Sequence, residues 1–458
     1  MSQANPLLVP ELREMLDTND VENIKLFCEA EHPAIIADFL SALEPVEIFE
    51  ILKHTNLELQ AKIISHLTED TQVAVVEIMG KLEIAKLLGE MAHDDRADIF
   101  KQLSKKLQNL ILPALAQAER EDIRRLASYE EGTAGAVMTS DYATLALHLT
   151  TSEAVEVLRQ VAPDKETIYY TYILDDNRKL LGMVSLKDII VATKDTPLSE
   201  IIETDIAYAM VSDHQEDVAH KMRKYDIIAL PVLNEDESMV GIITFDDIED
   251  VIVEEATIDF HSLGAISQPT DGELSGIDMR DTSILLMVRK RLPWLLILVF
   301  VNIISGAGIA HFESTIQAVV ALVFFLPLLI DSGGNAGSQS STLMVRALAT
   351  GQAKMSDWLY LLTKEVLVAS ILGLGMGLAA SVLGFWRGGP EIALIVSLTM
   401  ACIVVFGSLV GMSLPFLLNK LKLDPATASA PLITSLADIG GILIYFNIAT
   451  YFLKDKIG

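Results

Sequence analysis

Residues 430–445 read Ala-Pro-Leu-Ile-Thr-Ser-Leu-Ala-Asp-Ile-Gly-Gly-Ile-Leu-Ile-Tyr, and they place one carboxylate, Asp438, inside an apolar stretch of membrane length. A carboxylate at that depth is costly and is rarely retained unless it faces a cation or a water-filled path. Residues 430–453 contain no Lys or Arg that could pair with it on the same stretch. The stretch therefore predicts a membrane protein with a cation pathway.

Five apolar runs of membrane length fill the C-terminal part of the chain. Each is near or above the ~20 residues that a transmembrane helix needs. The runs are about 292–311, 316–345, 358–385, 391–418 and 427–453. Basic residues cluster before the first run, after the second and after the fourth, which places these flanks in the cytoplasm. We expect a five-helix transmembrane domain at 284–458 in the bacterial plasma (inner) membrane, with the C-terminus outside and the N-terminal half in the cytoplasm.

The rest of the chain is strongly acidic. The full sequence has 34 Lys and Arg against 63 Asp and Glu, a net charge of −29. Residues 280–458 hold 12 basic and 9 acidic residues, which leaves 22 basic and 54 acidic residues, a net of −32, in residues 1–279. Such a surface repels nucleic acid, so no nucleic-acid partner is expected. Its self-repulsion weakens a compact state unless cations screen it.

A helical repeat occupies residues 1–131. The stretches Ala37–Leu43, Ala61–Leu67 and Ala85–Met91 align at a period of 24 residues. Apolar positions within each stretch follow the i, i+3, i+4 spacing of an amphipathic helix. Short helices repeated at a fixed period typically stack into a superhelical array. We therefore expect an all-α superhelical domain here.

Residues 132–254 carry a strand–turn–strand–helix unit that returns after 59 residues. Gly182 aligns with Gly241, Ser185 with Thr244, and Asp188 with Asp247. β-branched and aromatic residues around 168–174 indicate the first of these strands. In pattern and repetition the unit resembles a tandem pair of cystathionine-β-synthase-type (CBS) domains, which have an α/β fold.

The CBS resemblance implies a nucleotide site. In that family the hydroxyl and carboxylate of the last motif can hold an adenosine ribose, and Ser185 and Asp188 match them. Lys187 could meet a phosphate, which makes ATP the candidate ligand. The alternative is structural, because a Ser at this position also caps the helix that follows. Both interpretations remain open from the sequence.

The second apolar run contains Gly-Gly-Asn-Ala-Gly-Ser-Gln-Ser at 333–340, followed by Arg-Ala-Leu-Ala at 346–349. This motif, together with the run at 430–445, resembles the signature of MgtE-type magnesium channels. The resemblance extends over essentially the whole chain, since the order of parts also matches: a helical N-terminal domain, a CBS pair, a connecting (plug) helix with its linker at 255–283, and five membrane helices. It implies a multidomain membrane protein with that fold class.

The MgtE resemblance implies a homodimer with a pore on its two-fold axis. Asp438 would be the selectivity carboxylate, with Asn335 and the backbone carbonyls near Thr434 and Gly441 beside it. Chemistry agrees with such a site, because Mg²⁺ prefers about six oxygen ligands and usually keeps several waters. Two symmetry-related carboxylates can therefore hold a hydrated ion.

The same resemblance implies that cytoplasmic Mg²⁺ binds the acidic domains and closes the pore. The matching regulatory positions are Asp94, Asp98, Glu216, Asp226, Asp247, Asp250, Glu255, Asp259 and Asp424. Any one of these acids, taken alone, is more often a solvated surface charge. The family pattern has a further acid just before Asp259, where this chain has Ile258.

Other functions compete with a Mg²⁺ channel. A secondary transporter that exchanges a divalent cation for H⁺ or Na⁺ could use the same membrane acid. A membrane enzyme would need a nucleophile next to a base, and the apolar runs show no such constellation, so we expect no enzyme activity. The sequence leaves open the selectivity over Ca²⁺, Mn²⁺ or Co²⁺.

Overall fold

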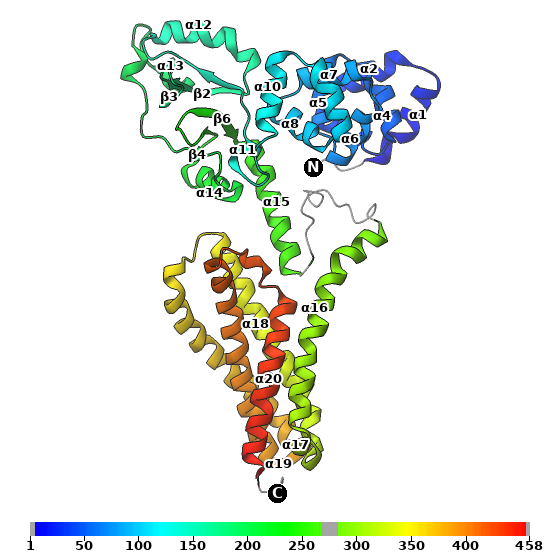
Figure 1. The fold of residues 1–458 in the computed structure, drawn as a ribbon, viewed down its shortest axis with the longest axis vertical. Helices are drawn as coiled ribbons and strands as arrows, with labels where there is room; N and C mark the ends of the chain where they lie inside the picture. Colours follow the sequence, from blue (N-terminus) through cyan, green and yellow to red (C-terminus); the bar gives the residue numbers. More distant parts are fainter. Residues whose placement is uncertain (1–4, 265, 267–282, 455–458) are drawn as a thin grey trace. The chain divides into compact units, whose positions relative to one another are not determined.

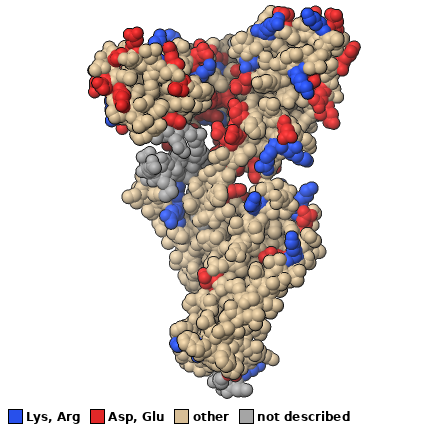
Figure 2. Space-filling view, turned by 180° about the vertical axis from the view of Figure 1, so that it is seen from behind, with Lys and Arg blue, Asp and Glu red and all other residues tan. Residues whose placement is uncertain are grey.

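The computed structural model describes residues 5–264, 266 and 283–454 (Figure 1). The chain divides into two compact units, Met1–Val253 and Glu254–Gly458. Most of the expected linker, residues 265 and 267–282, lies outside the described residues. Asp and Glu side chains gather over the first unit, whereas the surface of the membrane helices carries few charges (Figure 2).

The N-terminal part of the first unit is a regular array of short helices. Successive helices begin about 12 residues apart, so two helices make one 24-residue repeat. The helices are α1 (Val9–Asp17), α2 (Val21–Ala30), α3 (Pro33–Leu40), α4 (Pro45–Leu52), α5 (Leu57–Ser65), α6 (Glu69–Ile78), α7 (Lys81–Glu90), α8 (His93–Gln102), α9 (Lys105–Ile111) and α10 (Gln117–Leu126). Odd-numbered helices pack on one another from α3 to α9, which confirms the predicted superhelical array.

The repeat sets the core of this array. The first alanine of each aligned stretch is buried, Ala37 at 0%, Ala61 at 3% and Ala85 at 8% exposure. A small side chain at these positions lets consecutive odd-numbered helices approach closely. Larger apolar residues one turn further, such as Ile64 and Leu88, fill the space between them.

Two three-stranded sheets follow, as the CBS resemblance predicts. The first contains β1 (Tyr142–Thr144), β2 (Thr167–Leu174) and β3 (Leu180–Ser185), with helices α12 (Thr151–Val161) and α13 (Leu186–Val191). The second contains β4 (Ala209–Met210), β5 (Ala229–Leu233) and β6 (Met239–Thr244), with α14 (Gln215–Tyr225) and α15 (Phe245–Leu263). In each sheet the first pair of strands is parallel and the second pair is antiparallel.

Buried tyrosines tie the two sheets together. The Tyr142 hydroxyl donates to the Met239 carbonyl at 3.0 Å, and the Tyr172 hydroxyl donates to the Ala229 carbonyl at 3.3 Å. The helix α15 is continuous from the second sheet to Leu263. The expected connecting helix therefore begins inside the second CBS repeat and not after it.

The second unit is a bundle of long apolar helices. They are α16 (Ile284–His311), α18 (Leu326–Ala349), α19 (Trp358–Lys420) and α20 (Ala430–Phe452), with the short α17 (Glu313–Ala318) after α16. Within the described residues, these four long segments have the length and composition to cross a membrane. The predicted third and fourth runs both lie in α19.

The 63-residue α19 is broken at Gly389, whose φ of 78° lies in the left-handed region that glycine adopts readily. Pro390 follows directly and helps to end the first half. The halves fold back on each other, because Gly373 faces Ala401 and Gly377 faces Ser397. The helix therefore supplies two crossings, and the bundle has five membrane-length segments, as predicted.

Glycines bring α18 and α19 into backbone contact. A Cβ atom built on Gly407 would lie 2.2 Å from the Gly333 carbonyl oxygen, and one on Gly411 would lie 2.0 Å from that of Gly337. Paired glycines at four-residue spacing are a common device for close packing of membrane helices. Gly333 and Gly337 of the glycine-rich motif therefore serve packing, which leaves the polar residues between them for another role.

Candidate cation sites

Asp438 lies on α20, half-buried, one turn after Thr434. The Thr434 hydroxyl donates to the Ala430 carbonyl at 2.9 Å, so its hydrogen is used within the helix and its lone pairs remain. The Thr434 side chain packs on Gly334 of α18. Gly441 is buried and lies near Ile403. The structure thus brings Asp438 and Thr434 next to the α18 segment that carries Asn335.

Asn335 is bound to a second membrane acid that the sequence reasoning did not select. The Asn335 Nδ2 group donates to Asp331 Oδ2 at 3.0 Å. The charge of Asp331 also acts on Asp438. Asp438 is the only acid on α20, but Asp331 is a second acid on the membrane helices. The four-residue spacing of Asp331 and Asn335 was the signal that could have revealed the pair.

The polar residues of α18 divide between two faces. Ser332 and Ser341 are buried and donate to the Leu328 and Ala428 carbonyls at 2.6 and 3.2 Å. Asp331, Asn335 and Gln339 recur every four residues and are exposed in the single chain. Lipid cannot solvate such a stripe, so it needs water or another protein surface.

A second group of acids lies in the first unit, where α8 meets β2 and the start of α15. Its members are Asp94, Asp95, Glu166, Asp246 and Asp247, which act on one another electrostatically. We call this group the cytoplasmic acid cluster. Sequence reasoning found Asp94 and Asp247 but missed the other three. Asp95 and Asp246 adjoin chosen residues, whereas nothing in the sequence marks Glu166.

The cytoplasmic acid cluster is electrostatically unfavourable as it stands. Burial raises the pKa of Asp95 to about 7, and repulsion from Asp94 adds to the shift. Burial likewise raises the pKa of Asp94 and of Asp247. Repulsion from nearby acids raises both pKa values further. Glu166 is an exposed residue, but shielding of its carboxyl and repulsion from Asp94 also raise its pKa.

One oxygen of the cytoplasmic acid cluster fits a cation. Asp94 Oδ1 is buried and accepts no hydrogen bond within the described part of the chain. A buried, unpaired carboxylate oxygen is costly, and a cation would relieve that cost. Among residues 5–264, 266 and 283–454, however, no three His, Cys, Asp or Glu side chains converge tightly enough to hold a metal ion directly. The arrangement suits an ion that keeps much of its water, as Mg²⁺ does.

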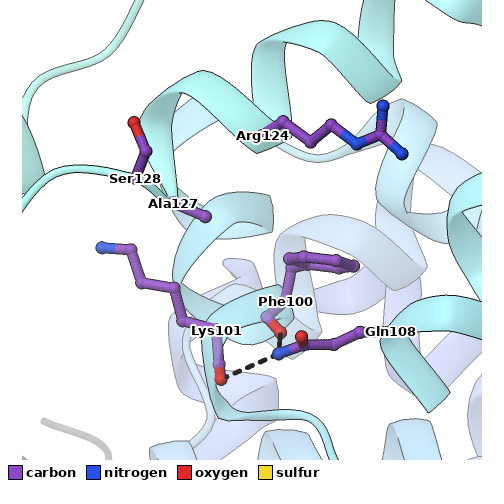
Figure 3. Close-up of a pocket in the computed structure, with 6 residues that line it drawn as sticks. All are labelled: Phe100, Lys101, Gln108, Arg124, Ala127 and Ser128. Carbon is purple, nitrogen blue, oxygen red and sulfur yellow. Dashed lines mark hydrogen bonds between the residues drawn. The ribbon is translucent and has the colours of Figure 1, made fainter. Parts of the chain in front are cut away.

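Asp98, one turn after Asp94 on α8, already has a protein cation. Lys101 Nζ lies 3.2 Å from Asp98 Oδ1 and 3.0 Å from Glu131 Oε1. The lysine stem lines a pocket between α8 and α10 that also contains Arg124 and Ser128 (Figure 3). Gln108 lines the same pocket, and its Nε2 group donates to the Phe100 and Lys101 carbonyls at 2.8 and 3.2 Å (Figure 3).

The remaining predicted regulatory acids are spread along three elements. Glu216 is in the first turn of α14, and Asp226 is its C-cap with φ of 53°. Ten residues of helix rise ~15 Å, so these two acids of one chain cannot ligate the same ion. Asp424 caps a short 3₁₀ helix before α20 and accepts from the Ala426 N–H at 2.8 Å.

Asp250, Glu255 and Asp259 lie further along α15 than Asp247. Asp250 is exposed, and its charge acts on His66 of α5. Glu255 and Asp259 are half-buried and lie one turn apart on the helix. Of the predicted regulatory residues, Asp94 and Asp247 therefore belong to the cytoplasmic acid cluster, and Asp98 borders it, since repulsion acts between Asp98 and both Asp94 and Asp95.

In the first CBS repeat, the structure shows the helix-capping arrangement. The Ser185 hydroxyl accepts from the Asp188 N–H at 3.0 Å and donates to Asp188 Oδ2 at 2.5 Å. Thr244 and Asp247 repeat this bond in the second CBS repeat. Lys187 is exposed beside the cap. The Ser185 and Asp188 side chains stay at the surface of the domain, so a nucleotide can still reach them.

Comparison with known proteins gives matches along most of the chain. Residues 326–448 match the MgtE family of divalent cation transporters, residues 31–132 match the MgtE intracellular N domain, and residues 134–195 and 198–254 match CBS domains. The magnesium transporter MgtE of Thermus thermophilus is 34% identical over 454 residues, which cover 98% of this chain and 99% of the relative. The Bacillus subtilis protein of the same name is 31% identical over 437 residues, 92% and 95% of the two chains.

Solved structures are similar to the first unit. The crystal structure of the soluble part of a magnesium transporter has 32% sequence identity and a TM-score of 0.51, and it covers 54% of this chain and 97% of its own. The cytosolic domain of the Mg²⁺ channel MgtE in complex with ATP has 33% identity and a TM-score of 0.50, covering 52% and 98%.

Proposed function

This chain belongs to the MgtE family of magnesium transporters, and on that premise we propose that it is a Mg²⁺ channel of the bacterial plasma membrane that closes when cytoplasmic Mg²⁺ binds its acidic domains. Membership of a transporter family also agrees with the expectation that it is not an enzyme. The observation that carries the proposal is Asp438, a carboxylate on an apolar helix beside a glycine-rich helix with an exposed polar stripe.

The pore is formed, in this proposal, by two copies of the chain. The exposed stripe of α18 supports a homodimer, because a second subunit and a water-filled path together would solvate Asp331, Asn335 and Gln339. Asp438 from each copy would hold a hydrated Mg²⁺. The Asn335 side chain and the backbone carbonyls near Thr434 and Gly441 would contact its water shell.

Closure is driven by the cytoplasmic acid cluster. Mutual repulsion among its members opposes close packing of α8 against the start of α15, and bound Mg²⁺ removes that repulsion. Since α15 continues toward the membrane unit in sequence, Asp250, Glu255 and Asp259 are suited to pass the change on, with Asp424 as an acid of the membrane unit. Asp98, Glu216 and Asp226 would contribute further sites.

ATP is proposed as a second ligand of the CBS pair. A relative of the first unit has been solved in complex with ATP, and Ser185, Lys187 and Asp188 present a hydroxyl, an ammonium and a carboxylate at one helix start. Loss of ATP binding in a Ser185→Ala, Asp188→Asn variant, measured by calorimetry on the full chain, would support this assignment. Unchanged affinity would refute it.

A secondary transporter coupled to H⁺ or Na⁺ is the competing function. Asp331 and Asp438 both lie on membrane helices, and a coupled transporter could use such acids to take up and release a proton. Recording from purified protein in a planar bilayer separates the two. Discrete Mg²⁺ currents that follow the electrochemical gradient and disappear at high cytoplasmic Mg²⁺ support the channel. Flux that requires a proton or sodium gradient supports the exchanger.

A further inference from the structure

We propose that Asp331 is a second cation-binding carboxylate of the pore, and that Asp331 and Asp438 act together to favour divalent over monovalent cations. The inference rests on the proposed Mg²⁺ pathway and adds a specificity-determining residue to it. Three observations carry it: the depth of Asp331, the bond that orients it, and the lack of a basic partner.

Helix register places Asp331 at the depth of Asp438. Contacts between α18 and α20 run in opposite directions, since Gly337 faces Ile433, Gly334 faces Thr434, and the Leu322 carbonyl accepts from the Tyr445 hydroxyl at 2.8 Å. One turn back from Gly334 along α18 leads to residues 330–331. One turn forward from Thr434 along α20 leads to Asp438. The electrostatic interaction between the two carboxylates agrees with this register.

The hydrogen bond from Asn335 fixes the Asp331 side chain. Asp331 Oδ2 accepts the Asn335 N–H at 3.0 Å, which leaves Asp331 Oδ1 and the Asn335 amide oxygen available as acceptors. Carboxylate and amide oxygens are the ligands that hard divalent cations prefer, directly or through water. The pair therefore presents a preorganised set of oxygen ligands on an exposed helix face.

No basic residue neutralises either acid in the described structure. The ion pairs found in residues 5–264, 266 and 283–454 include neither Asp331 nor Asp438. Two unneutralised carboxylates at one depth repel each other strongly where the dielectric constant is low. In the proposed dimer four such carboxylates lie at this depth, so a divalent ion neutralises twice as much of their charge as one monovalent ion does. This difference is the physical source of the proposed selectivity.

A structural role makes different predictions. If Asp331 only held Asn335 in position, a neutral side chain that accepts the same hydrogen bond would preserve both flux and selectivity. Asp331→Asn is such a change, because its amide oxygen can accept from Asn335 while the charge is lost. Asp331→Glu is the complementary change, since it keeps the charge and lengthens the side chain.

The experiment measures Mg²⁺ and Na⁺ flux into liposomes containing the full-length protein. Asp331→Asn should lower both Mg²⁺ flux and the Mg²⁺/Na⁺ flux ratio about tenfold, the change expected if one charge contributes ~1.4 kcal/mol to preferring the divalent ion. Asp331→Glu should retain most of the ratio. Glu313→Gln is the matched control, because Glu313 also accepts from an amide four residues on, Gln317 at 2.9 Å, and lies outside the proposed pathway on α17.

The outcomes separate this inference from the proposed function. If Asp331→Asn matches the unaltered protein in flux and ratio while Asp438→Asn is inactive, the second carboxylate is refuted and the Mg²⁺ pathway stands. If Asp331→Asn and Asp331→Glu are equally impaired, the loss does not follow the charge of Asp331 and the inference fails. If Asp438→Asn also conducts normally, the proposed function itself fails. Should Asp331→Asn not assemble, Asp331→Ser tests the same loss of charge with a smaller side chain.

Discussion

The two groups of acids in this molecule differ in their surroundings and in their proposed roles. Asp331 and Asp438 lie on membrane helices with no ion-pair partner in the described structure, at the place where we propose that an ion passes. The cytoplasmic acid cluster lies among other acids in a domain of high negative charge, where raised pKa values show that full ionisation is resisted. We infer that the first group uses its repulsion to attract a passing ion, whereas the second uses it to report how many ions are present.

The largest effect is expected at the membrane acid. Asp438→Ala should reduce Mg²⁺ flux to the level of protein-free liposomes while the protein stays folded and dimeric, because no other residue of α20 carries a charge. Flux is measured with a Mg²⁺-sensitive dye, and assembly by size-exclusion chromatography. Normal Mg²⁺ flux in this variant would remove the proposed distinction between a pore site and a sensor site.

Neutralising the cytoplasmic acid cluster should leave conduction unchanged and alter closure. In the triple variant Asp94→Asn, Asp95→Asn, Asp247→Asn, the Mg²⁺ concentration that half-closes the channel should rise about tenfold, within the ~1–3 kcal/mol typical of coupling between sites. Single-channel conductance should stay the same. The control triple Glu14→Gln, Glu22→Gln, Glu29→Gln removes equal charge from exposed positions of the same domain. A triple variant that closes normally but conducts poorly would mean that sensor and pore residues are exchanged.

Protonation of the cytoplasmic acid cluster should relieve its repulsion, as Mg²⁺ binding does in the proposed function. The pKa of Asp95 rises from its usual value near 4 to about 7 in the folded protein, so between these values the folded state holds the extra proton. The free energy of unfolding should therefore fall as the pH rises through this range, by about 1 kcal/mol for Asp95 between pH 6 and 8. Exposed Glu166 should add less, because solvent screens it.

Limited proteolysis of the full-length protein near residues 130–150, with EDTA only in the Mg²⁺-free samples, gives a direct readout. Cleavage should be slower at pH 6 than at pH 8, and Mg²⁺ should slow it at pH 8 as well. Equal cleavage rates at both pH values and with or without Mg²⁺ would show that the cluster does not control how these domains pack.

The smallest effect is expected at Lys101, whose ammonium neutralises Asp98 next to the cluster. Lys101→Met should lower the Mg²⁺ concentration for closure by about twofold, since partly exposed ion pairs contribute less than ~1 kcal/mol. Lys105→Met, an exposed lysine on α9, is the control. A shift in the opposite direction would mean that Lys101 stabilises the closed arrangement instead of competing with Mg²⁺.

Features of the fold that repeat along the sequence could be predicted. Features that depend on which helix faces come into contact could not. The 24-residue repeat predicted the stacked helices because α3, α5 and α7 each bury the same small alanine. The glycine-rich motif indicated that α18 has a functional or packing role. The spacing of its residues did not show that the glycines pack on α19 while Asp331 and Asn335 lie on the neighbouring face. Glu166 was missed for a similar reason: it precedes β2 in a loop, and only folding brings it to α8 and α15.

The backbone contact between α18 and α19 has a mechanical consequence. Gly407 and Gly411 leave little room between the backbones of these two helices, so we expect the pair to move as one stiff unit. The helix α16 is different: only 6% of its membrane-length window is buried in the chain, compared with 39–56% for the other long helices. Because few of its side chains pack against the rest of the chain, α16 can tilt with little loss of contacts. Because α16 precedes these helices in the chain, we infer that it can tilt without deforming the packing of α18 against α19.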